Sequence, residues 1–232
     1  DKIQEALENY GVDIHFITGG TLTNLTFLSH ALRPYEAVIS ADTGHINTHE
    51  TGAIEASGHK VLSIPCTDGK LTADLIRPVL KQHENEHWVE PRLVYISLPT
   101  ELGTVYTKEE LEKLYQFCKR HNLYLYIDGA RLAMALAVEE TQLTLKDLPD
   151  LCDAFYIGGT KNGAMFGEAL ILVNDDLKDH FRFNMKQRGA ILAKGWMIGV
   201  QFEELFQDNL YLELGKRSVA LAQRLKEGFI DC

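Results

Sequence analysis

The stretch Leu123-Tyr124-Leu125-Tyr126-Ile127-Asp128-Gly129-Ala130-Arg131 joins an apolar run to a polar end. The apolar part predicts a strand that ends at Asp128. The same arrangement occurs twice more, because polar or glycine residues also follow the apolar runs Arg92–Leu98 and Ala154–Ile157. The run Arg92–Leu98 is continuous enough to predict a strand buried on both faces, which is typical of parallel sheets.

Further strands and helices alternate on both sides of this stretch. The other predicted strands are Ile14–Ile17, Ala37–Ser40, Lys60–Pro65 and Glu168–Val173. The predicted helices are Leu22–Leu32, Thr48–Ser57, Thr72–His83 and Thr107–Lys119, the last with Glu110 placed for a capping box. Such alternation predicts an α/β fold of three layers, with a mostly parallel sheet and helices on both of its faces. In such sheets ligands bind beyond the carboxyl ends of the strands.

The composition indicates the size of the domain and limits the kinds of molecule that the protein binds. The 232 residues are 45% apolar and carry a formal net charge of −10. We expect one large domain over residues 1–200, and in residues 201–232 the start of a smaller C-terminal domain that is cut short. The acidic balance argues against a nucleic-acid partner. No run is long enough to cross a bilayer, and the four cysteines form no CxxC pair, so we expect a reduced, cytoplasmic protein.

Three segments carry chemistry, and the first is Thr18-Gly19-Gly20-Thr21 between a strand and a helix. Glycines allow the backbone to approach a ligand, and a helix N-terminus offers free N–H groups to a phosphate. Taken alone, an ordinary helix cap made of glycine and threonine explains this segment equally well.

The second and third segments supply a carboxylate and an amine. Asp128 at a strand end can hold a cofactor ring nitrogen in its protonated state, although a turn aspartate that caps the next helix is the commoner case. Lys161 follows a buried strand and Gly158-Gly159-Thr160, where a sheltered amine could form a Schiff base. An exposed loop lysine is the simpler alternative. The three segments together are more specific than any one of them.

In combination these segments resemble the large domain of fold-type-I pyridoxal-phosphate enzymes, and within that group the threonine aldolase branch of the β-eliminating lyase family. The matching segments lie between residues 18 and 161. They are Gly20-Thr21-Leu22-Thr23-Asn24, His45-Ile46 with Glu50 and Gly52, Asp128-Gly129-Ala130-Arg131-Leu132, and Thr160-Lys161.

The resemblance implies that the cofactor is pyridoxal 5′-phosphate and assigns the residues that hold it. Gly20 and Thr21 match the pair that binds the phosphate. Asp128 matches the partner of the ring nitrogen. Lys161 matches the Schiff-base lysine, and Thr160 precedes it in the same motif.

The substrate side of the resemblance contains both matches and departures. His45 matches a histidine that stacks on the ring, and Arg131 matches an arginine that binds the substrate carboxylate. Many threonine aldolases carry a second histidine near the substrate hydroxyl, where this chain has Glu101. Many also carry a histidine two residues before the aspartate, where this chain has Tyr126. The exact substrate stays open, and so does the catalytic base, which could be His45, a water or Glu101.

The reaction that the resemblance implies is cleavage of a β-hydroxy-α-amino acid, such as threonine, to glycine and an aldehyde. The alternatives are β-elimination, transamination and a catalytically silent homologue that serves as a binding protein. We expect a homodimer or homotetramer, with no nucleic-acid or membrane partner. We expect no metal site, since His45 and His49 share a helix face but no third ligand is evident in the sequence.

Overall fold

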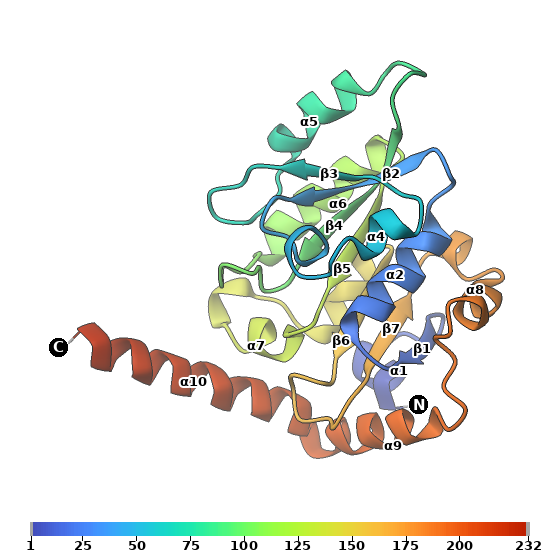
Figure 1. The fold of residues 1–232 in the computed structure, drawn as a ribbon. Coiled ribbons are helices and arrows are strands. Elements are labelled where there is room, and N and C mark those ends of the chain that lie inside the picture. Colours follow the sequence, from blue (N-terminus) through green and yellow to red (C-terminus); the bar gives the residue numbers. More distant parts are fainter. Residues whose placement is uncertain (1, 231–232) are drawn as a thin grey trace.

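A seven-stranded sheet forms the middle layer of the computed structural model, which describes residues 2–230 (Figure 1). The strands in chain order are β1 (Asp13–Ile17), β2 (Glu36–Ala41), β3 (Val61–Ile64), β4 (Glu90–Ser97), β5 (Tyr124–Asp128), β6 (Ala154–Gly158) and β7 (Glu168–Leu172). Across the sheet their order is β1-β7-β6-β5-β4-β2-β3, and β7 runs antiparallel to both of its neighbours. The other pairs are parallel, which confirms the mostly parallel sheet that the sequence predicts.

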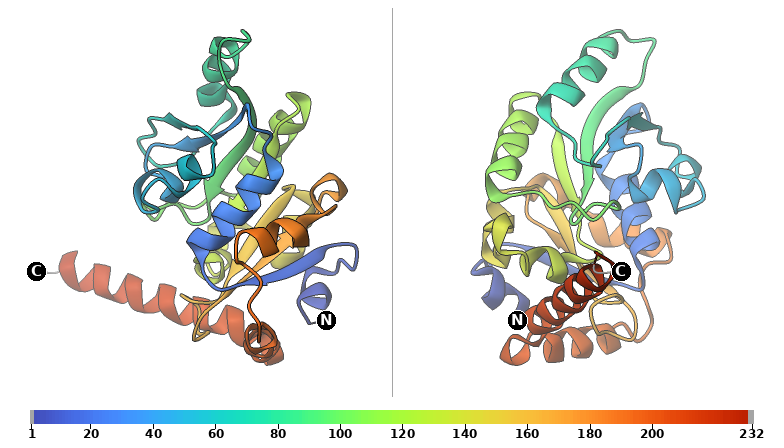
Figure 2. Two further views of the ribbon diagram at one scale, coloured as in Figure 1. Left: turned by 45° about the vertical axis from the view of Figure 1, so that its right-hand side comes forward. Right: turned by 90° about the vertical axis from the view of Figure 1, so that its left-hand side faces the viewer.

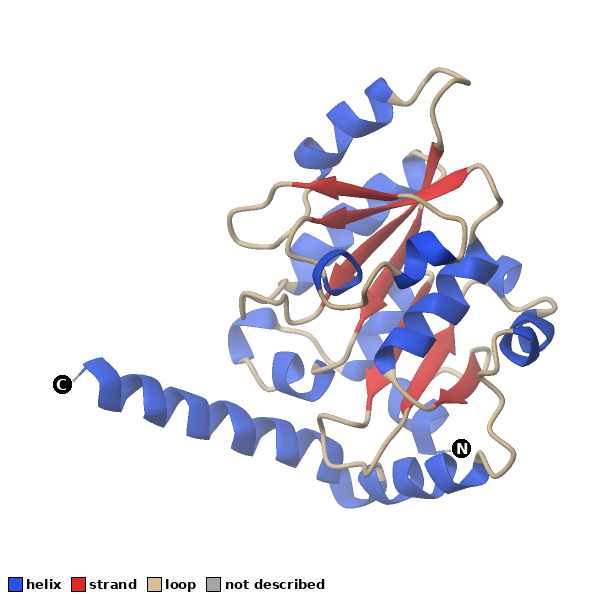
Figure 3. Ribbon diagram, in the orientation of Figure 1, coloured by secondary structure: helices blue, strands red, loops and turns tan. Residues whose placement is uncertain are grey.

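Helices cover both faces of this sheet, as Figure 3 shows. The α-helices are α1 (Lys2–Leu7), α2 (Gly20–Ala31), α3 (His45–Thr48), α4 (Ala53–Ala56), α5 (Ala73–Gln82), α6 (Lys108–Arg120), α7 (Leu132–Leu136), α8 (Phe181–Gln187), α9 (Trp196–Leu205) and α10 (Leu210–Ile230). Short 3₁₀ turns occupy Glu139–Thr141, Leu145–Asp150, Asp175–Leu177 and Gln207–Asn209. The helices α2, α4 and α8 lie on one face of the sheet, and α5 and α6 lie on the other (Figure 2). Their buried side chains belong to two separate cores. The three-layer fold is therefore confirmed.

Side chains of the central strands alternate between two cores, one on each face of the sheet. In β4, Tyr95 packs into one core and Ile96 into the other, and in β5 Tyr126 and Ile127 divide in the same way. Because both faces are covered, the middle of each of these strands is apolar on both sides. This explains why their sequences show continuous apolar runs rather than an alternation of apolar and polar residues.

Most predicted elements agree with the structure to within two residues at each end. The capping box before α6 is present: the N–H of Glu110 donates to the Thr107 hydroxyl, and the N–H of Thr107 donates to the Glu110 carboxylate. Thr72 also caps α5 by accepting a hydrogen bond from the N–H of Leu75. Local sequence signals of this kind depend on contacts within one turn, so they can be predicted without knowledge of the fold.

The predicted helix Thr48–Ser57 is wrong. The structure has two four-residue helices here, α3 and α4, with a turn between them. Thr51 and Gly52 in this turn have φ angles of 52° and 70°, and such a left-handed conformation ends a right-handed helix. The turn buries Glu50 in the protein. A contact with distant residues therefore overrides the local preference for a helix.

The loop that follows β5 touches strand β6 through its backbone. A Cβ atom at Gly129 would lie 2.0 Å from the carbonyl oxygen of Tyr156, and one at Gly158 would lie 2.3 Å from that of Ala130. The N–H of Gly158 donates a hydrogen bond of 3.0 Å to the carbonyl of Gly129. Glycine is required at both positions because no larger residue leaves room for this contact.

The two C-terminal helices differ in how they pack: α9 contributes to the core, and α10 projects from it. The predicted domain boundary at residue 200 falls inside α9, whose buried residues Ile198, Phe202 and Leu205 join the core beneath the sheet. Helix α10 projects away from the body, and residues 221–230 are exposed (Figures 1 and 2). The division into two domains stays a prediction. Within residues 2–230, no helix combines the length and the apolar character needed to span a membrane.

We expect Gly129→Ala to destabilise the fold by about 2 kcal/mol or more, because the added methyl group has no space unless β6 moves. Urea unfolding followed by circular dichroism measures this change. Gly228→Ala is the matched control, since it lies in α10 and nothing approaches its Cβ position within 4 Å. Equal stability of the Gly129→Ala variant and the wild-type protein would contradict the close backbone contact.

Candidate active site

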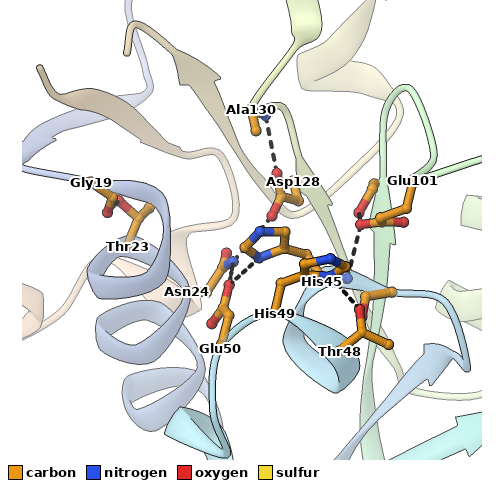
Figure 4. Close-up of polar contacts among 12 residues, drawn as sticks. Gly19, Thr23, Asn24, His45, Thr48, His49, Glu50, Glu101, Asp128 and Ala130 are labelled. Atoms are coloured by element: carbon orange, nitrogen blue, oxygen red, sulfur yellow. Dashed lines mark hydrogen bonds and ion pairs between the residues drawn. The ribbon is translucent and has the colours of Figure 1, made fainter. Parts of the chain in front are cut away.

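Polar side chains from separate segments meet beyond the carboxyl ends of β4 and β5, as Figure 4 shows. They come from α2, from α3 and the turn after it, from the loop after β4 and from the last residue of β5. The side chains are those of Asn24, His45, Glu50, Glu101 and Asp128. In parallel α/β sheets this edge is where ligands bind.

Asp128 is a buried carboxylate with donors on both oxygens. Its Oδ2 accepts hydrogen bonds from the Tyr95 hydroxyl (2.6 Å) and from Asn24 Nδ2 (3.1 Å). Its Oδ1 accepts a hydrogen bond from the N–H of Ala130 (3.0 Å). A buried carboxylate needs such donors because removal from water destabilises its charge. The protein thus holds Asp128 in one orientation at the end of β5.

Three buried tyrosines surround this carboxylate: Tyr95, Tyr126 and Tyr156. The pKa of each phenol is raised, first by burial and then by the charge of Asp128. The phenols therefore stay neutral and can act as O–H donors. Tyr126 donates to Asn24 Oδ1 (3.0 Å), which orients the amide so that its Nδ2 group faces the carboxylates.

A second buried carboxylate, Glu50, lies beside the first. Its Oε1 accepts hydrogen bonds from Asn24 Nδ2 (2.7 Å) and from His45 Nδ1 (2.8 Å). The Asn24 amide therefore donates to both Glu50 and Asp128, one hydrogen to each. The Glu50 side chain is fully buried, and its Oε2 has no hydrogen-bond partner in the described part of the chain.

His45 is partly buried, and its electrostatic surroundings favour the protonated ring. Its pKa is raised above the ordinary value, chiefly by the hydrogen bond with Glu50. Burial lowers the pKa, the charge of Asp128 raises it, and the charge of Lys161 lowers it. The His49 ring lies parallel to the His45 ring, with 5.3 Å between the centroids and an angle of 17° between the planes.

The loop between β1 and α2 has the form of an anion site. Helix α2 begins at Gly20, and Gly19 before it provides no side-chain cap. The Thr23 N–H donates to the Gly19 carbonyl (3.0 Å), whereas Gly20 and the next two residues have no N–H acceptor within residues 2–230. A Cβ atom at Gly20 would lie 3.1 Å from the Tyr156 hydroxyl. Free N–H groups at the start of a 12-residue helix suit a phosphate.

Lys161 lies in the turn between β6 and β7, and it is exposed. The sequence left a sheltered amine and an exposed loop lysine as alternatives, and within this chain the side chain is exposed. The role of Lys161 as the Schiff-base residue stays a prediction. Asn162 fixes the turn by donating from Nδ2 to the carbonyls of Gly158 (2.7 Å) and Ala130 (3.1 Å). Thr160 is also exposed, and its hydroxyl accepts a hydrogen bond from a backbone N–H of the same turn (3.0 Å).

Arg131 and Thr21 are exposed at the same edge of the sheet. Arg131 follows β5 and precedes α7. Its guanidinium has no hydrogen bond or ion pair with any residue that the structure describes, so it is available to an anionic group. Thr21 lies in the first turn of α2. The roles of both residues stay predictions.

Glu101 belongs to the same cluster. Its Oε1 accepts hydrogen bonds from the backbone N–H of His45 (2.8 Å) and from the Ser97 hydroxyl (2.6 Å). The Ser97 hydroxyl lies 3.3 Å from that of Tyr95, which in turn binds Asp128. Glu101 is therefore placed in the site and not on a remote surface, while its chemical role stays a prediction.

Sequence reasoning assigned no role to Asn24, Glu50 or Tyr95, all of which contact the predicted site residues. Asn24 and Glu50 belong to the segments that carried the resemblance, but the contact between them joins positions 26 residues apart. No local pattern reports such a contact. Tyr95 left a weak signal, because a tyrosine inside a fully buried strand needs a partner for its hydroxyl.

We expect Asn24→Asp to destabilise the fold by at least about 2 kcal/mol at neutral pH, since it places a third carboxylate against two buried ones. The loss should shrink in mildly acidic buffer, where protonation removes the repulsion. Urea unfolding at both pH values measures it. Asn85→Asp adds the same charge at an exposed position and serves as the control. A loss that does not change with pH would contradict this interpretation.

Comparison with known sequences identifies relatives of the chain. The family model described as beta-eliminating lyase matches residues 2–229. A low specificity L-threonine aldolase of Pseudomonas aeruginosa is 34% identical over 225 residues, which cover 94% of this chain and 64% of that protein. Another from a Pseudomonas species is 35% identical with the same coverage. The chain thus spans slightly less than two thirds of the length of these curated relatives.

Solved structures agree with these sequence matches. A threonine aldolase of Leishmania major is 57% identical, with a TM-score of 0.98, and the match covers 100% of this chain and 68% of that one. An aspartate aminotransferase of Thermus thermophilus is 15% identical with a TM-score of 0.66 over 91% of this chain and 53% of that one, a likeness of fold alone. The predicted fold class and resemblance are both confirmed, and the chain belongs to the beta-eliminating lyase family.

Proposed function

We propose that the chain forms the cofactor-binding part of a lyase that uses pyridoxal 5′-phosphate. The reaction is cleavage of a threonine-like β-hydroxy-α-amino acid into glycine and an aldehyde. The observation that carries this proposal is the cluster at the carboxyl edge of the sheet, where the buried Asp128 lies beside His45 and Glu101. The relatives named as low specificity L-threonine aldolases support the substrate class.

The residues present fit pyridoxal phosphate, the cofactor of this family. The free N–H groups of Gly20 and Thr21 suit its phosphate, and the oriented carboxylate of Asp128 suits a protonated ring nitrogen. The His45 ring would contact the cofactor ring, and Lys161 would hold its carbonyl carbon through the amine. When bound, the cofactor supplies a protonated ring that accepts the electron pair of the breaking Cα–Cβ bond.

Arg131 would bind the substrate carboxylate, since its guanidinium is exposed and has no partner among residues 2–230. Two parallel N–H···O bonds to a carboxylate fix orientation as well as position. That orientation decides which bond at Cα is aligned for cleavage. Thr160 and Asn162 hold the turn that carries Lys161, so the amine is presented from a fixed backbone.

We assign the acceptor of the substrate hydroxyl proton to Glu101. Its Oε1 is held by two hydrogen bonds, and its Oε2 forms none with the described residues. His45 is a weaker candidate, because Nδ1 is engaged by Glu50 and the raised pKa favours the ring that already carries a proton. When Glu101 takes the proton, the electron pair of the O–H bond forms the second bond of the aldehyde carbonyl.

We further propose that the protein is a cytoplasmic homo-oligomer. Exposed apolar side chains cluster on α9 and the segment before it: Leu192, Trp196, Met197 and Val200. A second copy of the chain would remove them from water. Cys66, Cys118 and Cys152 are free and buried, which fits a reducing compartment.

A product assay on the full-length protein with added pyridoxal phosphate tests the proposed function. L-Threonine should yield glycine and acetaldehyde. Pyruvate from serine or cysteine without aldol cleavage would indicate β-elimination, and a keto acid formed from an amino donor would indicate transamination. No turnover and no visible absorption band from bound cofactor would identify a silent homologue.

We expect borohydride reduction of the loaded protein to attach the cofactor to Lys161, because this lysine follows β6 at the carboxyl edge and its charge acts on His45. Peptide mapping by mass spectrometry locates the modified residue. Attachment at Lys186 or Lys194 would show that the assignment is wrong.

We expect Glu101→Gln to lower kcat for threonine cleavage by about 100-fold or more, the usual contribution of a general base, while cofactor affinity stays close to that of the wild type. Steady-state kinetics and cofactor titration separate the two effects. Glu84→Gln removes the same charge at an exposed position and should change neither quantity. An active Glu101→Gln variant would return the role to His45 or to water.

A further inference from the structure

We propose that Glu50 is a positioning residue: it holds His45 by Nδ1 and leaves Nε2 as the ring nitrogen that can meet cofactor or substrate. The purpose of this arrangement rests on the proposed function, whereas its geometry rests on contacts within the chain. Glu50 touches no reacting group in this assignment and acts through His45.

The hydrogen bond between the two residues determines where the ring proton lies. His45 Nδ1 and Glu50 Oε1 are 2.8 Å apart, and the Glu50 side chain is fully buried. A carboxylate accepts hydrogen bonds and does not donate them, so Nδ1 must carry the hydrogen. Free imidazole can place its hydrogen on either nitrogen, and the partner of one nitrogen decides the state of the other.

Glu50 is itself held so that it cannot follow the ring. Its Oε1 accepts a second hydrogen bond from Asn24 Nδ2, and Tyr126 fixes the opposite end of that amide. The turn at Thr51 and Gly52, with positive φ at both residues, directs the chain so that Glu50 is buried. The carboxylate is therefore a fixed reference point for the imidazole.

The remaining contacts of His45 leave one nitrogen free. Its backbone N–H donates to Glu101, and one face of its ring stacks on His49. Its Nε2 forms no hydrogen bond with any residue between 2 and 230. The backbone, Nδ1 and one ring face are thus engaged, so Nε2 and the opposite ring face are left for a ligand.

The charged groups around His45 make the role of Glu50 testable. The carboxylates around His45 are those of Glu50, Asp128 and Glu101, and the positively charged group is Lys161. His49 stacks on the ring. The hydrogen bond with Glu50 is the largest of the effects that raise the pKa of His45, and burial opposes it. Removing the Glu50 charge should therefore lower the pKa of His45.

Nitrogen-15 NMR of the full-length protein without cofactor tests the geometry directly. In the wild type we expect the His45 ring to be the Nδ1–H tautomer when neutral. Loss of one signal set in His45→Gln identifies His45 among the nine histidines. Glu50→Gln keeps an acceptor, so the tautomer should persist while the pKa falls. Glu50→Leu removes the acceptor, so the Nε2–H tautomer should become populated.

Steady-state kinetics of the enzyme with bound pyridoxal phosphate test whether the position of His45 matters for the reaction. Glu50→Leu should lower kcat for threonine by about 100-fold, because a His45 ring that is no longer held would be misplaced against the cofactor, with little change in KM. Glu50→Gln should recover most of this loss, because it restores the hydrogen bond without the charge. A residue needed only for folding would not show this split between kcat and KM.

Glu55→Gln is the matched control, since Glu55 is exposed on α4 only five positions away, and it should leave the His45 pKa and tautomer unchanged. A wild-type His45 in the Nε2–H form, or an unchanged His45 pKa in Glu50→Gln, would overturn the proposal. The spectra of the wild type and of Glu50→Gln are sufficient to test the proposal even if Glu50→Leu does not fold. Failure of the wild type to cleave threonine would overturn the proposed function instead, and would leave the NMR result standing.

Discussion

Two buried carboxylates lie side by side in this protein, and the arrangement of the whole site depends on how their charges are matched. An ionised carboxylate that leaves water loses its hydration, so Asp128 and Glu50 each need donors inside the fold. Neutral groups provide most of them: the amide of Asn24 bridges the pair, and the phenol of Tyr95 binds Asp128. His45 adds a group able to carry positive charge. The helix and strands that supply these donors are therefore fixed relative to one another.

The parallel sheet explains why the site lies where it does. Since β2, β4, β5 and β6 run in the same direction, their carboxyl ends form one edge, and segments distant in sequence meet there. Asn24 and Asp128 are 104 positions apart yet share a hydrogen bond. Both faces of the central strands are filled by apolar side chains, so polar groups can cluster at the ends of the strands but not along them.

The sequence predicted the features that arise from local or periodic contacts. Apolar runs located every strand, and the pair Thr107 and Glu110 located the start of α6. The helix expected over residues 48–57 failed because the burial of Glu50 depends on a partner in another helix. The sequence could not decide whether Lys161 is sheltered or exposed, since that depends on the three-dimensional surroundings of its turn. The identities of the residues were enough to predict the chemistry. The hydrogen bonds between them could be found only from the three-dimensional structure.

The backbone contact between the loop after β5 and strand β6 has a consequence for how this site tolerates sequence change. Gly129 and Gly158 bring two main chains together without intervening side chains, so the backbone at the end of β5 is held directly against β6. The distance between the backbone at Asp128 and the start of the turn that carries Lys161 is then set by contacts between main-chain atoms. Neighbouring side chains can diverge during evolution without altering it. Substitutions in the surrounding residues can therefore change which substrates are accepted, while the backbone spacing between Asp128 and the Lys161 turn stays the same.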